Sequence, residues 1–278
     1  MTPTHDPGPA RNDGHLHLGF DTRHGPDGGT AHFLQVMDDH RIRRACVVTP
    51  AVHGWDNTVT ATALREHPDR FVGIARLDPA GPDPVRMART LLERGFRGFR
   101  LSPSTPGDPD WLTDEVSHRV AAALERHGGV VCLHGGPGDL PAAARFARAH
   151  PGVTVLIDHG GRPDPSAPDH GFGPELRDLA GIDSVVIKTP NSSAFSHEPP
   201  PHGDLATYHR LVVEAFGAHR VMWGSDWPVC LSAGPYRAAL EAAEAALAGT
   251  GPTEQALVLG GTFDRVFAST SPPPKGSS

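Results

Sequence analysis

The sequence is poor in cysteine, in lysine and in long apolar runs. Cys46, Cys132 and Cys230 lie far apart without CxxC spacing, so neither a disulfide framework nor a thiolate zinc site is indicated, and we expect reduced thiols. Lysine occurs only as Lys188 and Lys275, which makes Lys188 stand out. Because no run of about 18 apolar residues and no basic-then-apolar start occurs, we expect neither a membrane span nor a signal peptide, and a cytoplasmic location.

Basic charge is also in short supply. The chain has 25 Lys and Arg residues against 32 Asp and Glu residues, which gives a net charge of −7. Proteins that bind nucleic acids through phosphates need a basic face, so this balance argues against that class. We expect a small-molecule substrate as the partner, with neither nucleic acid nor membrane, and the sequence predicts no oligomeric state.

Short runs rich in β-branched residues alternate with helical patterns such as residues 236–248. Such alternation predicts parallel strands joined by helical crossovers, which is the α/β class. Eight repeats favour a (β/α)8 TIM barrel over an open doubly wound sheet, and no GxGxxG follows the first run. The predicted strands are residues 15–18, 45–49, 71–77, 96–101, 130–134, 153–157, 184–188 and 221–224.

The chain of 278 residues could hold one barrel or two small domains, but no boundary is visible in the sequence. We therefore predict a single domain over residues 11–268. Residues 1–10 and 269–278 are rich in proline, glycine and serine, and we expect them to be disordered tails. Residues 162–173 and 197–203 are expected to be long loops after the sixth and seventh strands, where barrels carry function.

Two histidines lie two residues apart near the start. On a strand, His15 and His17 point to one face while Leu16 points to the other, and inside a barrel that face is the lumen. Two imidazoles at a strand end provide half of a metal site. The alternative is two unrelated polar residues in a turn after Asp13 and Gly14.

Three further polar residues follow predicted strands. His134, His159 and Asp226 each lie at the carboxyl end of a different strand, where barrel enzymes place catalytic groups. Each alone could be a buried core residue or, for Asp226, a helix cap. Together with the histidine pair, they predict an active site at one rim of the barrel.

With these residues the chain resembles the amidohydrolase superfamily, and within it the amidohydrolase-2 branch. The most similar part of that branch is the lactonase-like group, of the 2-pyrone-4,6-dicarboxylate lactonase and L-fuconolactonase type. The resemblance covers nearly the whole folded region in the order of the family. Its motifs are DGHLHL at 13–18, HGWDN at 53–57, FVGIARLDP at 71–79, GFRGFRLSP at 95–103, LIDHGGRP at 156–163, RVMWGSDWPVC at 220–230 and, more weakly, GGTFDRVF at 260–267.

The resemblance implies a mononuclear metal site of His15, His17, His134 and Asp226, with His159 as a catalytic residue. The fourth strand offers neither the lysine nor the glutamate that bridges two metal ions in binuclear relatives, so one divalent ion is the ceiling. Zinc is the expected metal and manganese the alternative. Operation without a metal stays open, because some lactonases of this branch keep the histidine pair and work without one.

Roles can be assigned on this basis. Asp226 would contact the metal and take a proton from the attacking water, and His159 would hydrogen-bond the substrate carbonyl oxygen. Arg100 is the candidate for gripping a substrate carboxylate, with a structural ion pair as the alternative. Weaker substrate-binding candidates are His53, Arg76 and Arg162.

Three functions remain in competition. The first is a hydrolase that opens a lactone or related cyclic ester or amide of a small, carboxylated molecule. The second is a metal-dependent non-oxidative decarboxylase of the same branch, whose usual insertions are missing from this short chain. The third is a metal-free barrel that binds a small molecule without catalysis. For Lys188 we expect an ion pair in the lumen or at its rim, and for Trp223 and Trp227 a packing role.

Overall fold

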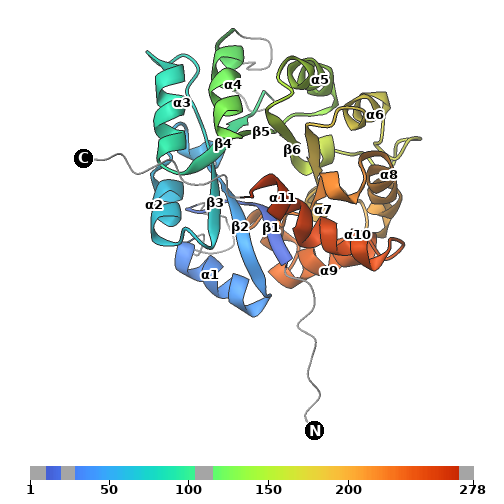
Figure 1. Cartoon of the computed structure of the whole chain (residues 1–278). Coiled ribbons are helices and arrows are strands. Elements are labelled where there is room, and N and C mark those ends of the chain that lie inside the picture. Colours follow the sequence, from blue (N-terminus) through green and yellow to red (C-terminus); the bar gives the residue numbers. More distant parts are fainter. Residues whose placement is uncertain (1–10, 20–28, 104–114, 269–278) are drawn as a thin grey trace.

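The computed structural model describes residues 11–19, 29–103 and 115–268, in which eight parallel strands pair in the order of the chain. Helices surround the sheet on its outer side (Figure 1). This arrangement confirms the predicted α/β (β/α)8 barrel. The strands are β1 Arg11–Leu16, β2 Ile42–Val48, β3 Phe71–Ala75, β4 Phe96–Leu101, β5 Val130–Leu133, β6 Thr154–Ile157, β7 Val185–Lys188 and β8 Val221–Met222.

In the described residues, helices α1 to α8 lie between successive strands, helices α9 to α11 follow β8, and the helices surround the sheet (Figure 1). Their bounds are α1 Thr30–Asp39, α2 Thr58–Glu66, α3 Pro84–Glu93, α4 Glu115–His127, α5 Leu140–Ala149, α6 Pro174–Ala180, α7 Ser192–Phe195, α8 Ala206–Phe216, α9 Tyr236–Ala246, α10 Pro252–Ala256 and α11 Thr262–Val266.

Each strand divides its side chains between two cores. Along β2, Ala45 and Val47 pack in the large core outside the barrel, whereas Cys46 and Val48 pack in a smaller core inside it. Both sets are buried, because helices cover the outer face and side chains fill the lumen. The same alternation on β4, β5 and β7 directs Arg100, Cys132 and Lys188 inward, at the carboxyl ends of their strands.

The barrel closes between β1 and the loop after β8. The backbone N–H of Gly14 donates to the carbonyl of Trp223 over 2.9 Å, and the N–H of Asp226 donates to the carbonyl of His15 over 2.8 Å. A Cβ at Gly14 would lie 2.6 Å from both Met222 Sδ and the Trp223 oxygen, so only glycine permits this approach. Closure therefore places the first histidine beside Asp226.

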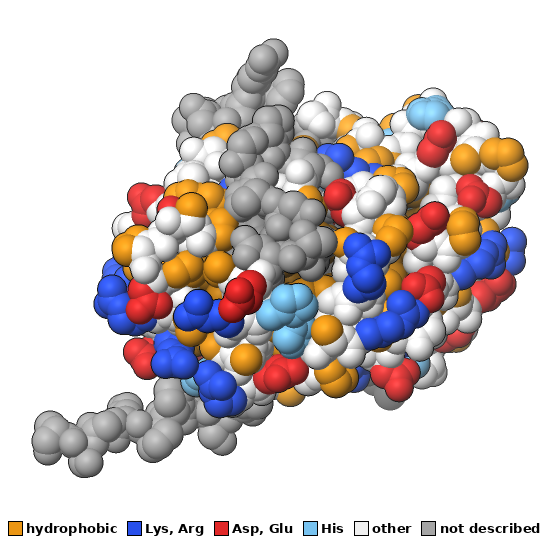
Figure 2. All heavy atoms as spheres, turned by 90° about the horizontal axis from the view of Figure 1, so that it is seen from above, with side chains coloured by type: hydrophobic (Ala, Val, Ile, Leu, Met, Phe, Trp, Pro, Cys, Tyr) orange, Lys and Arg blue, Asp and Glu red, His pale blue; other side chains and the backbone are white. Residues whose placement is uncertain are grey.

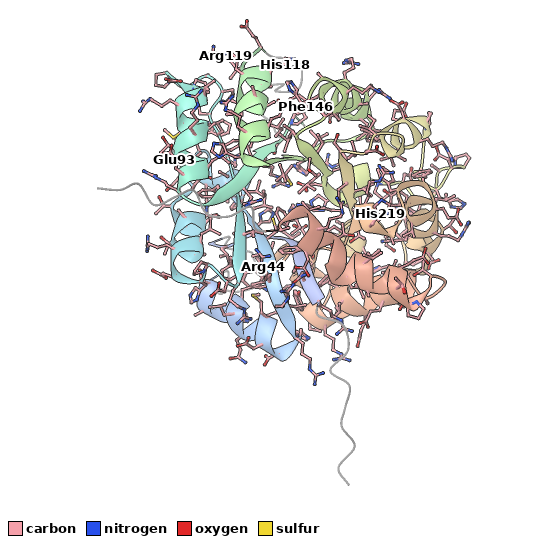
Figure 3. The ribbon with its side chains drawn as sticks, viewed as in Figure 1. Arg44, Glu93, His118, Arg119, Phe146 and His219 are labelled. Carbon is pink, nitrogen blue, oxygen red and sulfur yellow. The ribbon has the colours of Figure 1, made fainter. Side chains whose placement is uncertain are left out.

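Helix α11 closes the opposite, amino-terminal end of the lumen. Phe263 and Phe267 belong to the inner core, and the Arg44 guanidinium of β2 lies 5.4 Å from the centre of the Phe263 ring (Figure 3). The Asn12 side chain of β1 donates to the Gly260 carbonyl over 3.0 Å. With this end filled, the carboxyl ends of the strands are left to hold a site.

One strand begins earlier than predicted, and the two predicted tails lie outside the residues that the structure describes. Strand β1 begins at Arg11, four residues before the predicted start, because its polar first residues hide the pattern. The expected loops after β6 and β7 are present. The expected tails, 1–10 and 269–278, lie outside the described residues. Among the helices that are described, none combines the length and the apolar character needed to cross a membrane.

Candidate active site

The predicted site residues follow strands at the carboxyl-terminal rim. His15 lies on β1, and His17 follows the end of that strand. His134 directly follows β5, His159 lies in a turn directly after β6, and Asp226 lies in the loop after β8. Separate strands thus deliver these side chains to one end of the barrel.

Four of these side chains, those of His15, His17, His159 and Asp226, form one cluster. Asp226 Oδ1 lies 3.7 Å from His15 Nε2 and 3.4 Å from His17 Nε2. The His15 ring centre is 5.0 Å from that of His17 and 4.9 Å from that of His159. One ligand atom each from His15, His159 and Asp226 lie within 4.8 Å of one another. All four side chains are buried or nearly so.

His134 lies at the edge of this cluster. Its ring centre is 5.6 Å from that of His159, and its Nε2 is 3.5 Å from a terminal nitrogen of Arg162. The compact group of candidate ligand atoms contains His159 and does not contain His134. The role of His134 as a metal ligand stays a prediction.

Two of the clustered residues have unusual backbone geometry. His159 has a φ of 51° and Asp226 a φ of 59°, in the left-handed region that side chains other than glycine rarely adopt. Such conformations cost about 1–3 kcal/mol and concentrate at functional sites. Hydrogen bonds hold both: Tyr208 donates its hydroxyl to the Gly160 carbonyl in the turn, and Asn191 donates its amide to Asp226 Oδ2 over 3.0 Å.

The electrostatics favour neutral imidazoles beside an ionised carboxylate. Burial lowers the pKa of His15 and of His159, and it lowers the pKa of His134 to about 3 with help from the charge of Arg100. For Asp226, burial alone would raise the pKa, but the surrounding histidines outweigh it and hold the pKa well below its usual range. This is the protonation state that metal binding requires.

The atoms present fit a divalent ion. His17 Nδ1 donates to the Val48 carbonyl over 2.7 Å, which turns its Nε2 toward Asp226 Oδ1 over 3.4 Å. Ligands of a tetrahedral site with bonds of about 2.0–2.1 Å are separated by about 3.4 Å. His15 Nε2 is moreover buried without a hydrogen-bond partner.

A second cluster, which we did not predict, lies beneath the first. Asp158 is fully buried, and its carboxylate lies 3.1 Å from Lys188 Nζ, 3.3 Å from Arg100 Nε and 3.3 Å from His15 Nδ1. Lys188 thus forms the lumen ion pair that was expected of it. The opposite charge of Asp158 raises the pKa of Lys188 although burial alone would lower it. Alternation along β6 could have revealed Asp158, because Leu156 also points inward.

The predicted substrate-binding residues lie in different settings. Arg100 is buried and pairs with Asp158, which was the structural alternative for it. Arg76 is also buried, with its guanidinium 4.8 Å from the centre of the Trp55 ring. His53 Nε2 is 3.0 Å from the Gly19 carbonyl oxygen. Arg162 is exposed beside His134, and the contact of all four with substrate stays a prediction.

The two tryptophans near Asp226 pack in the core, as expected. Trp223 and Trp227 are buried, and the Trp227 ring centre lies 4.8 Å from that of Phe33. Their bulk packs beside the loop that carries Asp226.

With this geometry in place, comparison with known proteins assigns the family. The model of the amidohydrolase family, Amidohydro_2, matches residues 15–268, and the chain belongs to that family. It is therefore an enzyme of the amidohydrolase superfamily, as the sequence motifs predicted.

Its relatives include lactone hydrolases. A 4-sulfomuconolactone hydrolase of Rhizobium radiobacter is 30% identical over 204 residues, which are 73% of this chain and 67% of that protein. An L-fucono-1,5-lactonase of Burkholderia ambifaria is 33% identical over 157 residues, or 55% of this chain and 53% of the relative. The match thus spans only about half the length of the fuconolactonase.

A solved structure has the same architecture. It is a putative 2-pyrone-4,6-dicarboxylic acid hydrolase of Pseudomonas putida, with a TM-score of 0.78 and 26% identity over 93% of this chain and 97% of that chain. The lactonase-like resemblance seen in the sequence is confirmed by these relatives.

Proposed function

We propose that the protein is a hydrolase that uses an activated water to open a lactone, or a related cyclic ester or amide, of a small carboxylated molecule. The observation that carries this proposal is the convergence of His15, His17, His159 and Asp226 at the barrel rim, with Asp226 Oδ1 within 3.7 Å of two imidazole nitrogens. The lactone-hydrolase relatives support the same reaction class.

We further propose that His15, His17, His134 and Asp226 hold one divalent ion, which leaves His159 free to act on the substrate. Zinc fits three imidazoles and a carboxylate, and manganese accepts them as well. Such an ion, when bound, would lower the pKa of water from 15.7 to about 7 and so provide hydroxide at neutral pH.

The side chains then have distinct tasks. Asp226 is ionised and can take the proton of the attacking water and later return it to the leaving oxygen. Asn191 keeps the carboxylate oriented through its bond to Oδ2, which leaves Oδ1 turned toward the histidines. His159, neutral in this setting, can donate a hydrogen bond to the carbonyl oxygen where negative charge develops.

The charges at the rim support a proposal for how the substrate is bound. Arg162 is exposed next to His134 at the rim and can reach a carboxylate that arrives from solvent. Acidic and basic side chains are interspersed on the described part of the face in Figure 2, which suits a small-molecule partner better than nucleic acid. The cytoplasm remains our prediction for the compartment.

A lactone panel with a pH indicator tests the proposal, together with elemental analysis of the purified protein. Acid release that follows metal content supports the hydrolase. Carbon dioxide release from aromatic or enoic acids would instead favour the decarboxylase, which the relatives support less. Ligand binding without turnover in either assay would favour the non-catalytic barrel.

A further inference from the structure

The feature that the proposed mechanism leaves unused is the pocket beneath His15. Three side chains from three strands surround it: His15 of β1, Cys132 of β5 and Asp158 directly after β6. The Lys188 ammonium of β7 lies in their midst, 3.1 Å from Asp158 Oδ1, 3.1 Å from Cys132 Sγ and 3.2 Å from His15 Nδ1. All four residues are buried.

The three N–H donors of the Lys188 ammonium have three polar atoms around them. A lysine ammonium has three N–H donors and no acceptor, and it donates here to Asp158 Oδ1 and Cys132 Sγ. His15 Nδ1, at 3.2 Å, can accept the third N–H only while the proton of this imidazole is on Nε2. Lys188 thus occupies the pocket as a cation that lies beside a nitrogen, a sulfur and a carboxylate oxygen.

The same three acceptors have the character and spacing of metal ligands. His15 Nδ1, Cys132 Sγ and Asp158 Oδ1 lie within 4.8 Å of one another, with Sγ 2.9 Å and Nδ1 3.3 Å from the carboxylate oxygen. Imidazole, thiolate and carboxylate are the ligands that zinc takes in proteins. His15 belongs to both groups, because its Nε2 faces Asp226 and its Nδ1 faces this lower pocket. With a metal ion in each site, His15 would be a bridging imidazolate whose remaining proton is released to solvent.

We propose that Lys188 is the built-in cation of the lower pocket, where it takes the place of a metal ion and limits the barrel to the single ion of the upper site. Removing the ammonium then converts His15, Cys132 and Asp158 into a metal site that the native protein does not offer. The count of one ion rests on the proposed function, whereas the occupancy of the lower pocket by Lys188 does not.

Cobalt(II) is a suitable probe because a thiolate bound to it gives a charge-transfer absorption in the near ultraviolet. We expect the wild-type protein to take up cobalt without this absorption. Lys188→Met should gain the absorption and one further equivalent of cobalt per chain. Lys188→Arg, which keeps the positive charge, is the matched control and should show neither gain.

Adding Cys132→Ala to Lys188→Met assigns the signal, since Cys46 and Cys230 remain in that variant. The absorption and the additional equivalent should both disappear. A thiolate signal in the wild-type protein would overturn the proposal, as would a Lys188→Met variant that binds no more cobalt than its parent.

The Lys188→Met variant could be unstable, because Asp158 loses a partner. In that case the proposal predicts a Tm that rises with cobalt concentration, and a smaller rise once Cys132→Ala is added. A variant that stays unfolded with and without cobalt would also count against the proposal. All comparisons are made with the parent protein, so the inference can hold even if no lactone is hydrolysed and the upper site binds nothing.

Discussion

Replacing Asp226 by asparagine tests the central claim with the smallest change of shape. The variant keeps the volume of the side chain and can keep the bond from Asn191, because the asparagine carbonyl accepts as Oδ2 does. It loses the negative charge that faces two imidazole nitrogens at 3.4 and 3.7 Å, and with it the proton acceptor for water.

The expected loss follows from that single role. General-base catalysis contributes about 100- to 10,000-fold to a rate, which is about 3–5 kcal/mol of transition-state free energy. We expect kcat of Asp226→Asn to fall by at least this factor, and KM to change little, because Asp226 is not assigned to gripping the substrate. Metal content should also fall if the carboxylate is a ligand.

The assay is steady-state hydrolysis of the best substrate of the lactone panel, with the metal content of each sample measured. Asp178→Asn is the matched control, because this exposed carboxylate on α6 pairs with Arg148 and lies on none of the site elements. A value of kcat/KM for Asp226→Asn within tenfold of wild type would refute the assignment of Asp226 as the proton acceptor.

Three further predictions follow from the same geometry. Chelator treatment should lower lactone hydrolysis at least tenfold, about 1.4 kcal/mol, and added zinc should restore it; full activity of a metal-free sample would contradict the metal assignment. Asp158→Asn leaves Lys188 and Arg100 buried without their counter-charge, so urea unfolding should show a loss of about 3–5 kcal/mol. Burial lowers the pKa of His209, so the unfolded chain binds the proton first and stability should fall as the pH drops below about 6.5. Urea unfolding at several pH values should show a weaker fall for His209→Gln, and an equal fall would exclude this histidine as a contributor.

The sequence was sufficient to predict the barrel because its strands and helices can be recognised from short, local sequence patterns. The strands β3, β5 and β6 are largely apolar runs buried on both faces, and such runs can be recognised without knowing their partners. The start of strand β1 was predicted four residues too late, because its first residues are polar. They are covered by α11 and by the segment before it, where Gly260 accepts from Asn12.

The upper cluster was predicted from the sequence, but the lower one was not. His15, His17, His159 and Asp226 stand at strand ends within recognisable motifs, so their convergence follows from the topology. Asp158 was overlooked because its role as the partner of a buried cation depends on Lys188. Lys188 is 30 residues away and meets Asp158 only through the register of β6 with β7. The side-chain pairing of neighbouring strands is a tertiary property that composition does not disclose.

The two clusters together also bear on the substrate. Within them the cations Lys188 and Arg100 balance the carboxylates of Asp158 and Asp226, so the imidazoles stand in a site with no net charge from these groups. A divalent ion in the upper site would make the rim strongly positive, and Arg162 adds to that charge at the entrance. A positive cleft concentrates anionic ligands, and a carboxylated substrate is the one that such a field would favour over a neutral lactone of equal size.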